Sequence, residues 1–414
     1  MDIDRQALAK KEKIEHSLTL GVLYSILSIY PTIIISVVPG VLLIQGTGPS
    51  DKNETLGLVL KNGPPPPQPL LQIAKYLSER GFAVLRYDKR GVGGNLTILD
   101  KNVWGNATVN DLIHDAEKDL NVLIAQKLPE VNGTKKITII GHSEGTIIAP
   151  RVAVDNPTKV RNIVLIGAQA QNLRDNVYFQ YAYLPILYAE EVLDHNHNGS
   201  ISIQEASKDP TFQSLTITQL SPTTVKLLLN GKVVTTAQLL QSFKNASNNS
   251  SKQKYVSIDK DLKPLLVKKI VSLPAENASC DIDGCPIWWK SHFSLGTTLG
   301  MIGNVSSSTG ILILQGENDT NTPVQQAFML QQRLTEVNHP DYMLITYPGL
   351  GHELSPAIGY FTGSSMYGLQ KSGPIEDYAL ADLYAWLEAH SGLSHLYVTT
   401  TSTIGANTSS SSKR

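Results

Sequence analysis

The stretch ITIIGHSEGTIIAPRVAV, residues 137–154, holds the pattern that decides the fold. Its first four residues, Ile137–Ile140, are β-branched and mostly apolar, which predicts a buried strand. The pentapeptide GHSEG follows at once, and the residues after it have the apolar spacing of a helix. A G-x-S-x-G between a strand and a helix predicts a nucleophile elbow, in which Ser143 stands on a strained turn and glycines leave room for neighbouring backbone.

The rest of the chain alternates short apolar runs with longer amphipathic segments. The strands expected to be buried on both faces are Val38–Gln45, Phe82–Asp88, Lys135–Ser143, Asn162–Gln169, Gly310–Gly316 and Asp341–Gly349. Helical patterns begin at Pro69, Asn110, Thr146 and Pro323, and a last one covers Ile375–His390. Such alternation predicts an α/β protein with a mostly parallel, doubly wound sheet.

A serine hydroxyl needs a base and a carboxylate to become a nucleophile near neutral pH. In a sheet of this kind they are expected after later strands, in the order Ser, Asp or Glu, His. Asp319 follows one of the predicted strands closely, and His352 follows the next. Glu317 is the competing carboxylate, but the offset of Asp319 from its strand suits the reach better. The predicted catalytic residues are Ser143, Asp319 and His352.

The loop after the first predicted strand, residues 45–51, reads QGTGPSD. Its glycines allow the backbone to turn toward a substrate, and the backbone N–H of Thr47 is the expected donor to a developing oxyanion. The second expected donor is the N–H of Glu144, the residue after the nucleophile. A phosphate-binding P-loop is excluded because it needs a Lys at a spacing that is absent from this loop.

Five segments together resemble the α/β-hydrolase superfamily, and specifically its esterase and serine-aminopeptidase-like branch. They are IQGTGPSDKNET (44–55), GFAVLRYDKRGVG (81–93), GHSEG (141–145), GENDTNTPV (316–324) and GLGHE (349–353). The resemblance implies the same three residues as the triad and a carboxylic ester or related acyl compound as the substrate. It also implies a structural rather than catalytic role for Asp88 and Arg90.

The alternation of strands and helices stops between Ala170 and Ser308, where the composition turns to Asn, Ser, Gln, Lys and Tyr. This stretch is predicted to be a largely helical lid inserted into the hydrolase sheet. The expected divisions are an N-terminal segment 1–16, a first core part 17–169, the lid 170–308, a second core part 309–392 and a disordered Ser/Thr-rich tail 393–414.

A charge-free stretch precedes the first predicted strand. Its inner part, Leu18–Val38, has the ~20-residue length of a membrane-spanning helix, so an N-terminal anchor is one interpretation. The resemblance favours another, in which Ser17–Pro31 forms a β-hairpin at the sheet edge. The segment is rich in β-branched residues and Tyr, and Pro31 is poorly placed for a helix interior. Membrane association is therefore not favoured.

Residues 194–205, DHNHNGSISIQE, match the EF-hand pattern D-x-[DN]-x-[DN]-G-x5-E at every fixed position. The oxygen ligands for calcium would come from Asp194, Asn196, Asn198, Ser200, Ser202 and Glu205. Only two of these residues are carboxylates and the sequence has no second such loop, so the expected affinity is weak, about 10⁻⁴–10⁻³ M. An Asn-rich turn that binds no metal is the alternative.

Composition excludes several classes of protein. The 414 residues carry a formal net charge of −1 and two cysteines, so no nucleic-acid partner, disulfide framework or Cys-rich zinc site is expected. Cys280 and Cys285 would close one small loop in an oxidising compartment or stay reduced otherwise. Twelve N-x-[ST] sequences favour an extracytoplasmic location, with an Asn- and Ser-rich composition as the plain alternative.

These patterns predict a serine hydrolase that acts on a small acyl substrate through an acyl-enzyme intermediate. The chemistry of the predicted triad needs no cofactor, and any bound Ca²⁺ would be structural. A serine peptidase or an acyltransferase would use the same triad. A non-catalytic, calcium-tuned binding protein on a hydrolase scaffold is a further alternative.

Overall fold

The computed structural model of the chain describes a central sheet, its flanking helices and part of the segment inserted between two strands. The described residues are 17–19, 38–56, 65–94, 97–126, 137–206, 208–209, 211–212, 215, 255–276, 280, 284–357 and 373–392. The predicted N-terminal segment 1–16, the predicted tail 393–414 and most of the predicted hairpin lie outside the described residues.

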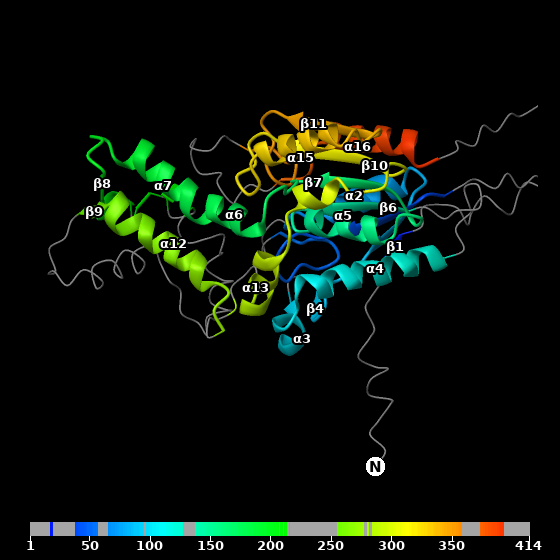
Figure 1. The fold of residues 1–414 in the computed structure, drawn as a ribbon, viewed down its shortest axis with the longest axis horizontal. Coiled ribbons are helices and arrows are strands. Elements are labelled where there is room, and N and C mark those ends of the chain that lie inside the picture. Colours follow the sequence, from blue (N-terminus) through cyan, green and yellow to red (C-terminus); the bar gives the residue numbers. More distant parts are fainter. Residues whose placement is uncertain are drawn as a thin grey trace, which may run out of the picture.

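Among the described residues, seven strands form one sheet in the order β1-β3-β2-β6-β7-β10-β11 (Figure 1). They are β1 Ser17–Thr19, β2 Gly40–Ile44, β3 Ala83–Arg86, β6 Ile137–His142, β7 Val160–Ile166, β10 Gly310–Gly316 and β11 Tyr342–Tyr347. Neighbouring strands run parallel except for β1 and β3, which are antiparallel. The predicted mostly parallel sheet is confirmed.

The order of the strands reverses at β2. The chain goes from β2 to β3 on one side and then returns to form β6 on the other side of β2. Such a reversal leaves a crevice at the carboxyl ends of the two diverging strands, where ligands of open α/β sheets bind. The loop that carries Thr47 begins at one of these strand ends, and the turn that carries Ser143 begins at the other.

Helices cover both faces of the sheet, because successive side chains of a strand point to opposite faces. Val41 and Leu43 of β2 belong to one hydrophobic core, and Leu42 and Ile44 belong to the other. The first core is covered by α2 (Pro69–Ser78) and α16 (Asp377–His390), and the second by α4 (Val109–Ala125), α5 (Gly145–Asp155) and α15 (Gln325–Glu336). The sheet is thus doubly wound.

Between β7 and β10 the chain leaves the sheet and forms the segment predicted to be a lid. Its described elements are α6 Leu173–Tyr178, η2 Phe179–Tyr183, α7 Leu184–Tyr188, η3 Ala189–Leu193, β8 Ser200–Ser202, α8 Ile203–Ala206, β9 Tyr255–Ser257, η4 Ile258–Leu262, α12 Lys263–Ser272, α13 Pro286–Ser294 and α14 Thr298–Ile302. The helices from α6 to α7 lie beside α12 and extend away from the sheet, with β8 and β9 at the far end (Figure 1). The chain returns through α13, which contacts α4 and α6. The role of a lid stays a prediction.

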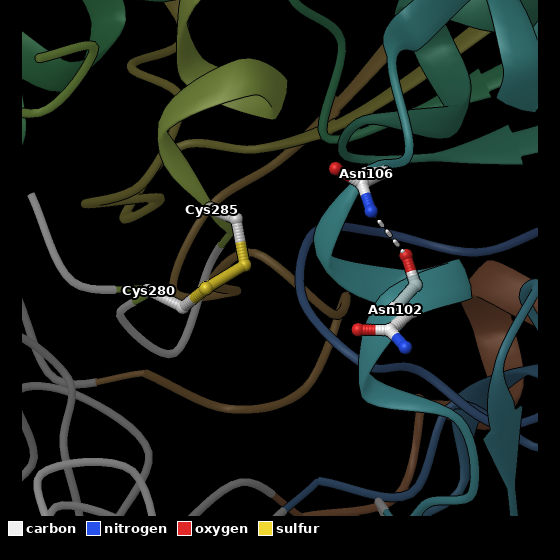
Figure 2. The surroundings of a disulfide bond; sticks show 4 residues. All are labelled: Asn102, Asn106, Cys280 and Cys285. Carbon is white, nitrogen blue, oxygen red and sulfur yellow. Dashed lines mark hydrogen bonds between the residues drawn. A yellow bond between two sulfur atoms is a disulfide. The ribbon is translucent and has the colours of Figure 1, made fainter. Parts of the chain in front are cut away.

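A disulfide joins Cys280 to Cys285 in this inserted segment (Figure 2). Cys285 directly precedes α13 and packs against Trp104 of the short helix α3 (Lys101–Gly105). Two short paired strands, β4 Val92–Gly93 and β5 Thr97–Ile98, precede α3. The disulfide therefore closes a short loop before α13, while the packing of Cys285 on Trp104 places the start of α13 beside α3.

One expectation about the strands is wrong. The strand after Asp341 was expected to be buried on both faces, but β11 is mostly half-buried, and the side chain of Met343 is 46% exposed. The cause is its position, because β11 lies at the edge of the sheet and has only β10 as a neighbour among the described strands. An apolar run alone does not distinguish an edge strand from a central one.

The opposite edge of the sheet is formed by β1, which lies within the charge-free stretch at the N-terminus. It pairs with β3 over three residues, Ser17–Thr19. The rest of the predicted hairpin, and with it most of the alternative membrane anchor Leu18–Val38, lies outside the described residues. Within the part of the chain that the structure describes, no helix combines the length and the apolar character needed to span a membrane.

Candidate active site

Ser143 stands on a tight turn between the end of β6 and the start of α5. Its backbone φ is +53°, in the left-handed region that residues other than glycine rarely occupy. A Cβ added at Gly141 would lie 2.2 Å from the carbonyl oxygen of Gly145, and one added at Gly145 would lie 2.5 Å from that of Ile44. Both glycines of the G-x-S-x-G are therefore required by close backbone contacts.

Asp319 and His352 meet beyond the carboxyl ends of β10 and β11. Nδ1 of His352 lies 2.8 Å from Oδ2 of Asp319, whose side chain is fully buried. Oδ1 of Asp319 accepts hydrogen bonds from the backbone N–H groups of Asn321 (2.8 Å) and Thr322 (2.7 Å). Oδ2 also accepts one from the side chain of Gln315 at 2.8 Å. The carboxylate is thus held in place and can orient the imidazole.

Glu317, the competing carboxylate of the sequence analysis, points elsewhere. Its Oε1 accepts a hydrogen bond from the hydroxyl of Thr346 in β11 at 2.9 Å. The two carboxylates are only two positions apart, so the difference arises from the turn that follows β10. The structure brings Asp319, rather than Glu317, to His352.

The imidazole of His352 lies over the turn that follows β7. A Cβ added at Gly167 would lie 2.7 Å from Cε1 of His352, so only glycine leaves room for the ring. Because β7 is the neighbour of β6, the imidazole lies at the same edge of the sheet as Ser143. The Ser143 hydroxyl makes no hydrogen bond to any described residue; such a contact often tightens only when substrate binds.

The loop after β2 lies against the elbow. A Cβ added at Gly46 would lie 3.1 Å from Cβ of Ser143, and the N–H of Gly46 donates to Oε1 of Glu54 at 2.5 Å. Thr47 and Glu144 line the same cavity as Ser143. Their backbone N–H groups have no acceptor among the described residues. The two expected oxyanion donors are thus beside the serine and available to a ligand.

Lys89 is a further charged residue of this site, and it was not among the residues predicted from the sequence. It lies in the RYDKRG turn after β3, with 6% of its surface exposed. Its Nζ donates to the carbonyl oxygens of Gly46 (2.5 Å) and Gly48 (3.2 Å) and to Oε2 of Glu144 (2.5 Å). Lys usually lies at the protein surface, and nothing in the local sequence marks Lys89 as buried.

The carboxylate of Glu144 is fully buried and lies among cationic and polar groups. Oε1 accepts a hydrogen bond from Nε1 of Trp288 at 2.9 Å, and Nε2 of His292 lies 2.8 Å from the same oxygen without hydrogen-bonding geometry. Burial by itself raises the pKa of Glu144, but the Lys89 ammonium and His292 lower it to about 2. The side chain therefore stays ionised at any pH near neutrality.

Asp88 and Arg90, the two chain neighbours of Lys89, have contacts with residues that do not line the cavity. Oδ1 of Asp88 accepts a hydrogen bond from the backbone N–H of Lys52 at 2.7 Å. The guanidinium of Arg90 forms ion pairs with Asp111 (3.0 Å) and Asp115 (2.7 Å) of α4. These contacts tie the turn to neighbouring elements.

His142 precedes the serine and is fully engaged in buried contacts. Its Nδ1 lies 2.9 Å from Oε1 of Glu54, and its Nε2 lies 3.2 Å from the carbonyl oxygen of His352. Burial lowers the pKa of His142, but the charge of Glu54 and its hydrogen bond outweigh this and raise the pKa to about 9. His142 is therefore a cation near neutral pH and cannot accept a proton there as a general base.

The cavity in front of Ser143 encloses about 420 Å³ together with its open mouth. It is walled on one side by the sheet domain and on the other by α6, η2 and α13 of the inserted segment. Its apolar lining comes from Leu173, Val177, Tyr181, Trp288 and Trp289, and its polar lining from Gln169, Asn176, Gln180 and Asn321. Most of the lining is thus supplied by the inserted segment.

The EF-hand-like loop leads into β8, which lies at the end of the inserted segment far from the sheet (Figure 1). Oδ1 and Oδ2 of Asp194 accept hydrogen bonds from the backbone N–H groups of Asn198 (3.1 Å) and Gly199 (2.7 Å). Ile201 is buried and pairs with Val256 of β9. The structure describes no group of three or more His, Cys, Asp or Glu side chains that could hold a metal ion.

The predicted ligand side chains of this loop differ in exposure. Asp194 is 5% exposed, whereas Asn196, Asn198 and Glu205 are exposed. Ser200 and Ser202 are half-buried in β8, and Oγ of Ser202 accepts a hydrogen bond from the backbone N–H of Glu205 at 3.3 Å. Calcium binding stays a prediction.

The fold described above, a mostly parallel sheet with helices on both faces, is that of the α/β hydrolases. A family model of the alpha/beta hydrolase fold matches residues 62–355, and the chain belongs to this family. Esterase EstD of Thermotoga maritima is 31% identical over 150 residues, a match that covers 36% of this chain and 31% of the esterase. The matched region is thus about a third of either protein.

Two solved structures are similar to this chain at low sequence identity. The monoacylglycerol lipase of Paleococcus ferrophilus is 15% identical, with 92% of this chain and 100% of the lipase covered and a TM-score of 0.42. A thermophilic esterase of Thermogutta terrifontis in a malate-bound form is 14% identical, with 91% and 94% covered and a TM-score of 0.44.

The ion pair between His142 and Glu54 predicts a pH dependence of stability. The pKa of His142 is raised from about 6.5 in the unfolded chain to about 9 in the folded protein. The pair therefore stabilises fully below pH ~6.5, and this contribution is lost as the pH rises to ~9. We expect the loss of stability caused by Glu54→Gln, measured by urea unfolding, to be largest near pH 6.5 and to shrink toward pH 9.

The matched control for this experiment is Glu79→Gln. Glu79 is an exposed carboxylate in an ion pair with Arg80 at 3.9 Å, and its replacement should change stability little at any of these pH values. A Glu54→Gln effect that is the same at pH 6.5 and pH 9 would show that His142 is not held in its charged form.

Proposed function

We propose that the protein is a serine hydrolase that cleaves a carboxylic ester. The observation that carries the proposal is the position of Ser143, a non-glycine residue at φ +53° on a strand-to-helix turn, at the sheet edge where the His352–Asp319 pair lies. A strained serine at the mouth of a cavity, with a base and an orienting carboxylate at the same edge, is the arrangement that activates a hydroxyl as a nucleophile.

The reaction follows from the roles of these groups. The Ser143 hydroxyl attacks the ester carbonyl and passes its proton to Nε2 of His352, while Asp319 holds the imidazole and stabilises its positive charge. The oxyanion receives hydrogen bonds from the N–H groups of Thr47 and Glu144. His352 then gives the proton to the departing alcohol, which leaves an acyl-enzyme. A water molecule, deprotonated by the same imidazole, releases the acid and restores the serine.

The choice of an ester over a peptide bond as the substrate is supported by a relative of this chain. Esterase EstD of Thermotoga maritima is described as an esterase, and about a third of this chain matches it at 31% identity. No feature of the described residues favours peptide cleavage, acyl transfer or a purely binding role.

Replacement of the proposed catalytic residues should abolish the turnover of p-nitrophenyl butyrate. Ser143→Ala removes the nucleophile, and Asp319→Asn favours the wrong tautomer of His352, so we expect kcat to fall by about 10⁴-fold or more in each. Glu317→Gln is the matched control for Asp319→Asn, because Glu317 lies in the same turn but bonds to Thr346, and it should keep kcat within about threefold.

The proposal fails if purified Ser143→Ala hydrolyses the ester as fast as the wild type. If Glu317→Gln loses activity and Asp319→Asn does not, the catalytic carboxylate has been assigned to the wrong residue. Labelling of wild-type protein by a fluorophosphonate, and its absence in Ser143→Ala, gives a readout that does not depend on the choice of ester.

We also propose that the loop 194–205 binds Ca²⁺ as a structural ion. The loop matches the EF-hand pattern in full, and two of its backbone N–H groups turn inward onto the carboxylate of Asp194. Gly199, at the position where the pattern needs glycine, has φ +76°. The ligands would be the six residues predicted from the sequence.

Calcium should stabilise the protein if the loop binds it. With a dissociation constant of about 10⁻⁴–10⁻³ M, 10 mM Ca²⁺ should add about 1.4–2.7 kcal/mol to the free energy of unfolding. Glu205→Gln should remove this effect, whereas Glu191→Gln, an exposed residue of the preceding helix, should not. Urea unfolding with and without Ca²⁺ measures the gain, and a wild-type protein that gains no stability in calcium contradicts the proposal.

A further inference from the structure

The ammonium of Lys89 is bonded to two backbone carbonyls of the oxyanion loop. It donates to the carbonyl oxygen of Gly46 at 2.5 Å and to that of Gly48 at 3.2 Å. These two carbonyls flank Thr47, whose N–H is the proposed oxyanion donor. Lys89 is therefore bonded to the backbone on both sides of Thr47, whose N–H must point at the oxyanion.

Because the peptide group is planar, the contact of Lys89 with the Gly46 carbonyl also fixes the direction in which the Thr47 N–H points. The carbonyl of Gly46 and the N–H of Thr47 belong to the same peptide group, and the described residues contain no cis peptide bond. In a planar trans peptide the C=O and the N–H point in opposite directions. A cation that holds the Gly46 oxygen on one side therefore directs the Thr47 N–H to the other side, and it also polarises that N–H as a donor.

The same ammonium is paired with the residue that carries the second donor. Nζ of Lys89 lies 2.5 Å from Oε2 of Glu144, whose backbone N–H follows the nucleophile. Oε1 of Glu144 accepts a hydrogen bond from Trp288 of α13. Both donors are thus joined through one buried ion pair, and the pair is joined to the helix that walls the cavity.

We propose that Lys89 and Glu144 form a positioning pair that keeps the N–H groups of Thr47 and Glu144 directed at the oxyanion. This inference rests on the proposed serine-hydrolase function. Lys89 does not contact the reacting atoms in this arrangement. It acts through the Gly46–Thr47 peptide, so it should lower the energy of the transition state more than that of the bound ester.

The test compares Lys89→Met, the double variant Lys89→Met/Glu144→Gln, and the wild type. Lys89→Met should lower kcat for p-nitrophenyl butyrate by about 10²–10³-fold, the loss typical of one oxyanion donor, and change KM by less than about threefold. A boronic acid inhibitor, which mimics the tetrahedral intermediate, should bind more weakly by a similar factor. Lys118→Met, an exposed lysine of α4, is the matched control and should keep wild-type kinetics.

The double variant distinguishes the loss of loop positioning from the effect of leaving the buried Glu144 carboxylate unpaired. Lys89→Met alone leaves Glu144 as a buried unpaired charge and should destabilise the fold, whereas the double variant removes both charges and should restore stability. If the role of Lys89 is positioning, kcat stays low in the double variant, because the Gly46 carbonyl is still not held. If kcat recovers together with stability, the inference is wrong. If turnover by the wild type does not depend on Ser143, the proposed function itself has failed.

A second observation concerns the substrate. Two amide side chains of the cavity, Gln169 and Asn176, are each 3% exposed, and Nε2 of Gln169 and Oδ1 of Asn176 have no hydrogen-bond partner among the described residues. Another amide of the same lining, Gln180, donates to the carbonyl oxygen of Asn321 at 2.7 Å. The cavity lining thus includes two amide side chains, each with one buried atom that the described residues leave unpaired.

We infer that the ester carries a hydroxyl or amide group beside its acyl carbonyl or on its alcohol, which pairs with Gln169 and Asn176. A purely hydrocarbon substrate would bury these two groups without partners, and each such group is costly. A cavity with unpaired polar groups discriminates strongly against a substrate that lacks the matching group. This inference also rests on the proposed function, but not on the role of Lys89.

The test is a matched panel: p-nitrophenyl butyrate, its 2- and 3-hydroxy derivatives, n-propyl butyrate and glyceryl monobutyrate. At least one hydroxylated ester should exceed its hydrocarbon counterpart by about 10- to 100-fold in kcat/KM. Gln169→Leu and Asn176→Leu should reduce that ratio at least tenfold, and urea unfolding shows whether each variant is folded. Lys118→Met, an exposed lysine of α4, is the control and should keep the wild-type ratio. If the wild type hydrolyses hydrocarbon esters as well as all hydroxylated ones, the inference is overturned.

Discussion

The site depends on the close packing of two backbone turns at the carboxyl ends of β2 and β6. The elbow at Ser143 lies so near Ile44, the last residue of β2, that position 145 admits no side chain. Position 141 admits none because it faces the backbone of Gly145 within the elbow itself. The same contact brings Gly46 of the neighbouring loop against the serine. Any element that widened this contact would separate the serine from the loop, so the parallel register of β2 and β6 is the first requirement of the site.

Two buried ion pairs secure the crevice between these turns. One joins Lys89 to Glu144, and the other joins His142 to Glu54, which also accepts the N–H of Gly46. Buried ion pairs add little to stability on balance, because desolvation opposes the attraction between the charges. In this protein both pairs form hydrogen bonds with the oxyanion loop and hold it against an adjacent strand end. They therefore fix the orientation of the loop. Preorganised donors of this kind need no rearrangement during reaction.

Much of this arrangement could be predicted from the sequence, because it depends on local patterns. The elbow was recognisable because a strand, a G-x-S-x-G and a helix are contiguous in residues 137–154. Asp319 and His352 could be located because parallel strands deliver their carboxyl ends to one edge of a sheet. The exposure of β11 was not predictable, since a strand at the edge and one at the centre have the same apolar run. Lys89 was overlooked because nothing local marks a lysine as buried.

The order of strands and helices, the elbow and the choice of Asp319 over Glu317 were readable from the chain alone, because they follow from periodicity, glycine spacing and distance from a strand end. The folded structure was needed to show where the Lys89 ammonium lies and that the cavity is lined largely by the inserted segment. Those outcomes depend on contacts between residues far apart in sequence, such as Lys89 with Glu144 and Trp288 with Glu144. Such contacts leave no periodic signal, so they appear only when the chain is folded.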